Sequence, residues 1–155
     1  MRAVVFINYS IAPFNAGHVG WGFETQPGYF CYGAKEAVGM QEVALPGYPN
    51  GAFGAVGTEQ EMQTAMKTGN HPGNGFPYND YKYVEVASLN VAAAIDLARQ
   101  CHHWGYTVVG NNCMDDVCRI IKAYAHGDGD ILPRPLAHAR PVDFFEAIPS
   151  PVQPL

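Results

Sequence analysis

The sequence predicts a single α+β domain, with an antiparallel sheet formed early in the chain and helices packed on one face of it. Strand-like segments crowd the first 35 residues, and the helix-like segments follow later. Seventeen glycines and twelve prolines divide the chain into short elements. Strands grouped ahead of helices are typical of the α+β class. A chain of 155 residues is long enough to bury one core without disulfides or metal.

The first three strands are predicted before residue 36. Arg2–Asn8 is a short run rich in β-branched and apolar residues, which is typical of a buried strand. His18–Glu24 alternates glycines with aromatic residues, and Tyr29–Lys35 follows after the turn Gln26-Pro27-Gly28. Two strands joined by so short a turn predict a β-hairpin.

The middle of the chain alternates loops with short elements. Leu45–Gly57 and Thr68–Asn79 are rich in glycine, asparagine and proline and predict loops that shape a cleft. Between them, Thr58–Lys67 predicts a helix, because Thr58 with Glu61 three residues later forms a capping box. Tyr81–Ala87 alternates as a strand does.

The last third of the chain carries the longer helices. Asn90–Trp104 is predicted as a helix closed by Gly105, and Tyr106–Val109 as a short buried strand before a second helix, Cys113–Ala125. The proline-rich end contains a helical turn at 142–148. We expect one domain over residues 1–148 and a flexible tail over 149–155.

Composition excludes several classes of function. The net charge is −5 and no run of Lys or Arg occurs, which argues against nucleic acid as a partner. No apolar run reaches the length of a membrane span. Residues 1–8 lack the features of a signal peptide, so we expect a cytoplasmic location, with export by a route without a cleaved signal as the alternative.

The four cysteines do not follow a metal-binding pattern. Cys113 and Cys118 are separated by four residues, and no C-x-x-C pair is present. We therefore expect no metal and no cofactor, and a disulfide framework is not expected either. Cys31, Cys101 and Cys118 are interpreted as small core residues.

Cys113 stands apart because of its place between a strand and a helix. Asn112 is a good N-cap, so Cys113 falls in the first turn of the predicted helix. Free backbone N–H groups and the positive end of the helix dipole favour a thiolate there. Asp115 and Asp116 in the same turn favour the dipole but raise the pKa of the thiol. The pattern predicts a nucleophile.

A nucleophilic cysteine needs a base, and His18 is the candidate we favour among six histidines. It begins a strand, which gives its side chain a defined direction. His102, His103 and His126 lie at helix ends, where histidine interacts with the last carbonyls. His71 lies in a loop and His138 in the proline-rich end.

These motifs resemble a known superfamily. Gly17-His18-Val19-Gly20-Trp21-Gly22-Phe23, followed later by Asn111-Asn112-Cys113 at the start of a helix, is similar to the circularly permuted papain-like proteins. They include lecithin–retinol acyltransferase-like proteins, PPPDE-type peptidases and permuted relatives of NlpC-type amidases. In this group the histidine strand precedes the cysteine helix, as it does here. The resemblance implies a permuted papain-like fold with the nucleophile at the N-terminus of the last long helix.

The resemblance also implies roles for individual residues. Cys113 would be the nucleophile and His18 its base, and aligning the hairpins places Tyr32 at the position of the third polar group. The Cys113 backbone N–H, with an amide of Asn111 or Asn112, would hold the oxyanion. Trp21 would contribute to the wall of the cleft.

The function predicted is that of a cysteine hydrolase, a peptidase or amidase. It would cleave amide bonds of a peptide, an isopeptide or a peptidoglycan fragment through a Cys113–His18 dyad and a thioester. Two alternatives remain open at this point. One is a papain-like binding module without activity, and the other is a thiol acyltransferase acting on lipid, although the chain offers no clear apolar segment for membrane contact.

Overall fold

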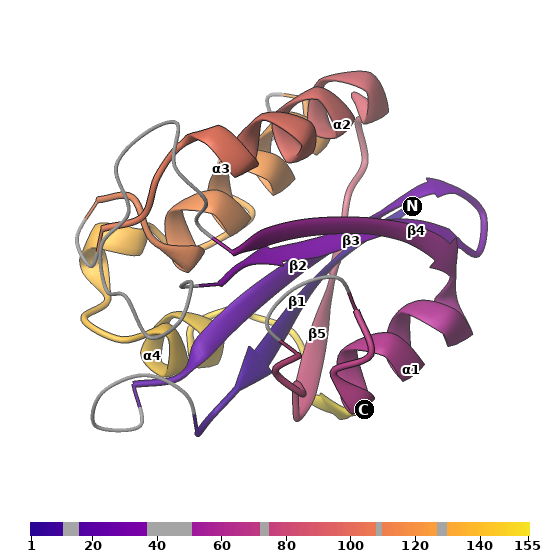
Figure 1. Cartoon of the computed structure of the whole chain (residues 1–155). Helices are drawn as coiled ribbons and strands as arrows, with labels where there is room; N and C mark the ends of the chain where they lie inside the picture. Colours follow the sequence, from indigo (N-terminus) through magenta and orange to yellow (C-terminus); the bar gives the residue numbers. More distant parts are fainter. Residues whose placement is uncertain (11–15, 37–50, 72–74, 108–109, 127–129) are drawn as a thin grey trace.

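The structure is a computed structural model that describes residues 1–10, 16–36, 51–71, 75–107, 110–126 and 130–155. This part of the chain contains a six-stranded sheet in the order β4-β3-β2-β1-β5-β6, and neighbouring strands are antiparallel throughout (Figure 1). The strands are β1 (Arg2–Asn8), β2 (His18–Gln26), β3 (Tyr29–Lys35), β4 (Ala52–Thr58), β5 (Asp80–Glu85) and β6 (Gln153–Pro154). The α+β class predicted from the sequence is confirmed.

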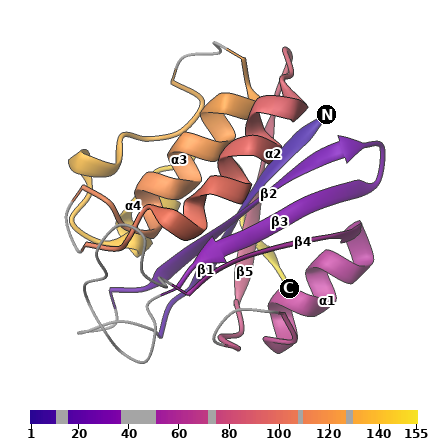
Figure 2. The same ribbon diagram turned by 45° about the horizontal axis from the view of Figure 1, so that its top comes forward.

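Helices lie on both faces of the sheet, whereas we expected them on one. They are α1 (Glu59–Thr68), α2 (Val91–Gln100), α3 (Cys113–Tyr124) and α4 (Pro141–Glu146), with short 3₁₀ helices η3 (Cys101–His103) and η4 (Pro135–Ala137). Figures 1 and 2 show α2 and α3 on one side of the sheet and α1 on the other. We call these sides the α3 face and the α1 face.

Each face has its own apolar core, because side chains along a strand alternate between the two sides. On β1, Val5 and Ile7 belong to the core of the α3 face, and Val4 and Phe6 belong to the core of the α1 face. The same alternation on β2 directs Val19, Trp21 and Phe23 towards α3. A sheet covered on both faces explains why β1, β2 and β3 are buried along almost their whole length.

Helix α3 is the most deeply buried helix and positions the candidate cysteine. Val117, Ile120, Ile121 and Tyr124 recur at helical spacing and are all fully buried against the sheet. At its far end, the Tyr124 hydroxyl donates a hydrogen bond of 2.8 Å to the Glu24 carbonyl of β2. These contacts fix the axis of α3, and therefore the position of its first residue, Cys113, relative to β2.

Several element boundaries differ from the sequence-based prediction. Strand β4 lies largely within the segment 45–57, which we predicted as a loop. The prediction was wrong because Gly54 and Gly57 weaken the strand pattern of the sequence. The approach of β4 to β3 depends on another glycine, since a Cβ at Gly33 would lie 2.1 Å from the Phe53 carbonyl oxygen. The predicted helix 90–104 ends as α2 at Gln100 and continues as η3.

Two further segments also differ from expectation. For the strand predicted at 106–109, the described residues show a bridge between Thr107 and Asn111, and residues 108–109 lie outside the described part. Residues 149–155 were expected to form a flexible tail. Instead, β6 pairs with β5, and the Leu155 N–H donates to the Asn79 carbonyl at 3.1 Å.

Candidate active site

The N-terminus of α3 is built as the sequence predicts. The Asn112 side-chain oxygen accepts hydrogen bonds from the N–H groups of Met114 (2.9 Å) and Asp115 (3.3 Å). The Asp115 carboxylate in turn accepts one from the Asn112 N–H at 3.0 Å, which completes a capping box. Cys113 is therefore the first residue of the helix. The cap also occupies the oxygen of the Asn112 side chain.

The Cys113 thiol is buried and surrounded by hydrogen-bond donors. Cys113 is only 2% exposed, and this burial raises the pKa of its thiol to about 11. The Val19 and Met114 N–H groups and the Tyr106 hydroxyl donate to Sγ and act against this rise, whereas the Asp116 charge adds to it. The thiol is therefore protonated at neutral pH, in a setting that already contains donors for a thiolate.

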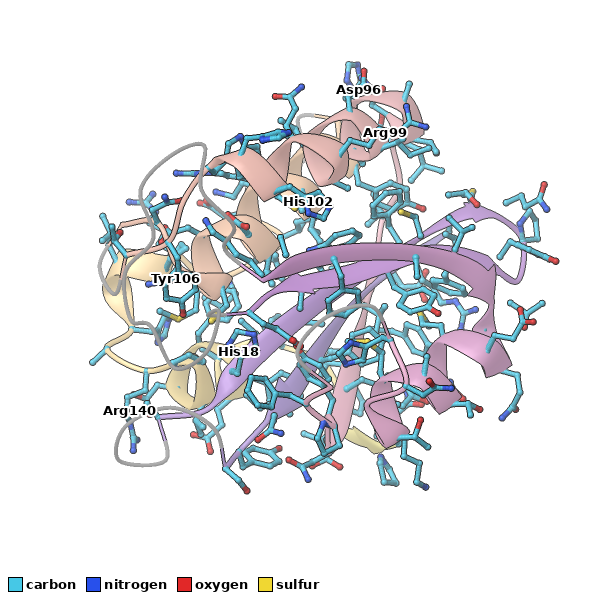
Figure 3. All side chains as sticks on the ribbon, viewed as in Figure 1. His18, Asp96, Arg99, His102, Tyr106 and Arg140 are labelled. Atoms are coloured by element: carbon cyan, nitrogen blue, oxygen red, sulfur yellow. The ribbon has the colours of Figure 1, made fainter. Side chains whose placement is uncertain are left out.

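Tyr106 is a second polar group in direct contact with Cys113. Its hydroxyl donates to Sγ and also accepts a hydrogen bond from the Cys113 backbone N–H. Burial, followed by the Cys113 charge, raises the pKa of this phenol. The hydroxyl therefore stands where the first N–H of α3 points, at a helix end suited to negative charge. Figure 3 shows Tyr106 and His18 at the same end of the sheet.

His18 is the first residue of β2 and is 5% exposed. Burial lowers the pKa of its imidazole to about 4, and Nε2 has no hydrogen-bond partner among the residues that the structure describes. The Val19 N–H bond to Sγ brings the Cys113 thiol to the peptide that joins His18 to Val19. Strand alternation, however, directs the His18 side chain towards the α1 face. The structure thus brings the thiol to the His18 backbone without a bond between Nε2 and Sγ.

Tyr32, the predicted third group, does not lie beside His18. It pairs with Gly22 in the register of β2 and β3, and its side chain belongs to the core of the α1 face. It also lines a surface hollow shared with α1. Continuing the register two residues past the pair Gly20–Ala34 sets Glu36 opposite His18. Glu36 is fully buried, which makes it a carboxylate candidate for the third position.

Glu36 belongs to a buried polar cluster on the α1 face. The Tyr78 hydroxyl donates to Glu36 Oε1 at 3.4 Å, and His71 Nε2 lies 3.9 Å from the same oxygen. The Tyr78 ring centroid is 6.2 Å from that of His18. Burial, then the charges of Glu36 and Cys113, raises the pKa of Tyr78 well above its usual value. Tyr78 therefore connects Glu36 with the region of His18 and Cys113.

Two other predicted residues are engaged inside the protein. The Asn111 amide nitrogen donates to the Trp104 carbonyl at 2.6 Å, and its side-chain oxygen accepts from Lys35 Nζ at 2.7 Å. Trp21 is fully buried and stacks on Phe23 at 5.9 Å between ring centroids, and no described residue forms a hydrogen bond with its Nε1. Asn111 therefore shapes the turn before α3, and Trp21 lies in the core of the α3 face.

Sequence reasoning missed Lys35, Glu36 and Tyr106. Lys35 is fully buried and forms an ion pair of 3.2 Å with Asp116 Oδ1. Lys35 and Glu36 follow the apolar run Phe30–Ala34, and such charged residues at the end of a buried strand were a usable signal. Tyr106 carried no signal of its own, because its role depends on the fold of the turn that follows it.

Further observations concern metal ligands, the cysteines, membrane-spanning helices and similarity to known proteins. Within the described residues, no group of three or more His, Cys, Asp or Glu side chains could hold a metal ion. The four cysteines are free thiols. In the same part of the chain, no helix is long and apolar enough to cross a membrane. Comparison with protein-family models, curated proteins and solved structures finds no match to this chain.

Proposed function

We propose that the chain is a thiol hydrolase with a circularly permuted papain-like fold, in which Cys113 attacks an amide carbonyl and His18 serves as the base. One observation carries the proposal. The Val19 N–H, in the peptide that joins His18 to Val19, lies close enough to the Cys113 thiol at the N-terminus of α3 to lower the pKa of that thiol. A helix N-terminus favours the thiolate, and the neighbouring residue supplies a group to take its proton.

The pKa values support transfer of the proton during attack rather than before it. The pKa of Cys113 is raised to about 11 and that of His18 is lowered to about 4, so both groups are neutral at pH 7. Nε2 takes the thiol proton as the S–C bond forms, then gives it to the leaving nitrogen as the C–N bond breaks. Water then attacks the thioester, His18 takes its proton, and the thiol is released.

His18 Nε2 is buried and lacks a hydrogen-bond partner within the described ranges, which suits this role. A buried polar atom without a partner is costly, so its presence needs an explanation. Catalytic hydrogen bonds are often long or absent without substrate and form in the complex. The proposal therefore requires the His18 side chain, which strand alternation directs towards the α1 face, to move round the end of β2 when substrate binds, and contact with Sγ would then give Nε2 a partner.

Tyr106 and Glu36 complete the proposed site. The Cys113 N–H and the Tyr106 hydroxyl already meet, and together they offer two donors to an oxyanion placed between them. Glu36 would orient the imidazole and balance its positive charge, acting directly or through the Tyr78 hydroxyl. These assignments replace Asn111 and Tyr32, whose side chains are engaged elsewhere. The substrate class proposed is a peptide, an isopeptide or a peptidoglycan fragment.

Site-resolved alkylation tests the proposal without a known substrate. The folded protein is treated with chloroacetamide at pH 7.5, and each cysteine is followed by mass spectrometry. Cys113 is expected to react faster than Cys31, Cys101 and Cys118, and His18→Gln to slow that reaction by about 10²-fold or more. Once a substrate is found, Cys113→Ala is expected to lower kcat by roughly 10⁴-fold or more.

Cys118 provides the matched control on the same helix. Its thiol is also buried, burial raises its pKa to about 12, and it donates to the Pro133 carbonyl at 3.5 Å. Cys118→Ala should leave Cys113 alkylation and turnover unchanged. The proposal is lost if Cys113 reacts no faster than Cys118, or if His18→Gln reacts as the parent does.

A papain-like binding module without activity is the second candidate. It is favoured by the 2% exposure of Cys113 and the pKa of about 11, since burial protects a thiol from reaction. Slow and equal alkylation of all four thiols in the folded protein, with fast alkylation in urea, would favour this candidate over the hydrolase.

A further inference from the structure

Lys35 ends strand β3 with its charged group sealed beneath the first turn of α3. Its side chain is fully buried, yet Nζ has three acceptors at hydrogen-bonding distance. These are Asn111 Oδ1 at 2.7 Å, Asp116 Oδ1 at 3.2 Å and the Asn111 carbonyl at 3.4 Å. An ammonium has three N–H groups. All three N–H groups of Lys35 can therefore be used by two residues, Asn111 in the turn before α3 and Asp116 in the first turn of α3.

Asn111 links Lys35 to the turn that carries Tyr106. The Thr107 N–H donates to the Asn111 carbonyl at 2.9 Å, and the Asn111 amide donates to the Trp104 carbonyl at 2.6 Å. Lys35 Nζ also lies 5.8 Å from the centre of the Tyr106 ring. The ammonium thus contacts both ends of the segment that brings the Tyr106 hydroxyl to Cys113.

Stability alone does not explain this pair. Removing two charges from water costs more than an ion pair commonly recovers, and apolar replacements are often as stable or more stable. Here the compensation is incomplete, because Asp116 Oδ2 is buried and has no hydrogen-bond partner in the described part of the chain. Burial raises the pKa of Asp116 to about 6, against the opposing charges of Lys35 and Arg119, and Asp115 adds to the rise. A buried ion pair that is poorly compensated and lies at the candidate site suggests that the pair positions other residues of the site.

We propose that Lys35 is a positioning residue of the candidate site: by holding Asn111 and Asp116 together, it fixes the turn that aims the Tyr106 hydroxyl at Cys113. The effect on Cys113 chemistry rests on the proposed function. The effect on the turn does not, so the two can fail separately.

The test compares three variants with the parent protein. Lys35→Met with Asp116→Leu replaces the buried pair by apolar side chains of similar size. Asn111→Ala keeps the pair and the backbone bonds of residue 111 but removes its two side-chain bonds, from Lys35 Nζ and to the Trp104 carbonyl, and it remains informative if the double variant does not fold. Lys82→Met is the matched control, because Lys82 is the other buried lysine and its Nζ binds the Ile148 and Glu146 carbonyls at 2.8 and 3.1 Å instead.

Two measurements are made on each variant. The first is hydrogen exchange of the Thr107 amide, whose acceptor is the Asn111 carbonyl. The second is the rate of Cys113 alkylation by chloroacetamide as a function of pH. Loss of positioning should speed Thr107 exchange by roughly tenfold or more in the double variant and in Asn111→Ala. It should slow Cys113 alkylation by roughly tenfold to a hundredfold.

Thr107 exchange and alkylation together separate positioning from a plain charge effect. The Asp116 charge raises the pKa of Cys113, but the double variant also removes the opposite charge of Lys35, 3.2 Å away, so the plain charge effect on alkylation is expected to be small. Faster alkylation with unchanged Thr107 exchange would overturn the inference. So would equal changes in Lys82→Met, which would mark a general loss of stability. If parental Cys113 is no more reactive than Cys118, the proposed hydrolase fails, and Thr107 exchange alone decides the role of Lys35.

Discussion

The two ends of the sheet differ in how deeply their charged and ionisable side chains are buried. At the end that carries the β2–β3 turn, Arg2 bridges Glu24 at 3.0 Å and Glu59 at 2.9 Å, and the Tyr83 hydroxyl also donates to Glu59. The Arg2 side chain remains 27% exposed. We call this the hairpin end. The opposite end, which we call the cysteine end, holds buried ionisable residues that include His18, Lys35, Glu36, Cys113 and Asp116.

The difference lies in how completely the buried groups are satisfied. The Arg2 guanidinium faces two carboxylates and also stacks over the Tyr83 ring at 4.3 Å. At the cysteine end, His18 Nε2 and Asp116 Oδ2 are buried without partners among the described residues. Figure 3 shows His18 at the end of the sheet away from the N-terminus marked in Figure 1. Proteins retain such costly groups mainly where they serve a function, so the contrast points to the cysteine end as the working end.

The largest expected difference between the ends is the cost of removing one cation. Lys35→Met leaves the Asp116 carboxylate buried and without its ammonium, which should lower the free energy of unfolding by about 3–5 kcal/mol. Arg2→Met breaks hydrogen bonds between charged groups that solvent can partly replace, and it should cost about 1.5–3 kcal/mol. Urea unfolding at pH 7 measures both. Equal losses would mean that the ends do not differ in solvation.

Acid should act on the cysteine end through His18. Burial lowers the folded-state pKa of His18 to about 4, below its ordinary value of 6.5. The unfolded chain therefore binds the proton more tightly, so the contribution of His18 is fully present above pH 6.5 and is lost as the pH falls towards 4. A depression of this size corresponds to about 3 kcal/mol.

A variant isolates this term from the other titrating groups. The free energy of unfolding of the parent and of His18→Gln is measured from pH 7 to pH 4, and the difference between the two curves is taken. The parent should lose about 3 kcal/mol more than the variant over this range. Asp116 works in the opposite direction, because its raised pKa favours the folded state at low pH. Parallel curves would show that His18 is solvated in the folded protein.

The sequence predicted local structure well where the signal was local. The capping box predicted at Thr58 and the N-cap predicted at Asn112 need only a few consecutive residues, and both are present at the start of α1 and α3. The third polar group failed to emerge because it depends on strand register. The register shifts between Glu24 and Gln26, and one extra residue on β2 moves every later pair by one. Counting outward from the turn therefore does not find Glu36.

The buried pair was also beyond sequence reasoning. Lys35 and Asp116 are 81 residues apart, and only the packing of α3 on β3 brings them together. Asp116 was interpreted as a first-turn acid that favours the helix dipole, a role that needs no partner. The sequence shows that α3 has an apolar face but not which strand end lies beneath it. Long-range polar contacts of this kind follow from the tertiary fold.

The smallest expected change in stability comes from two matched deletions of a hydroxyl group. Tyr83→Phe removes a donor to Glu59 at the hairpin end and should cost about 1.5–3 kcal/mol, as hydrogen bonds to charged groups do. Tyr106→Phe removes a hydroxyl bonded to a neutral thiol at pH 7 and should cost about 0.5–1.5 kcal/mol. Urea unfolding ranks the two.

Reactivity should rank these deletions in the reverse order. The Tyr106 hydroxyl donates to Sγ and lowers the pKa of Cys113, so Tyr106→Phe should slow Cys113 alkylation near neutral pH by roughly tenfold per unit of pKa. Tyr83 lies at the other end of the sheet, and its loss should leave that rate unchanged although it costs more stability. If both variants slow alkylation in proportion to the stability they lose, Tyr106 acts only as a packing residue. Its hydroxyl would then have no specific effect on the reactivity of Cys113.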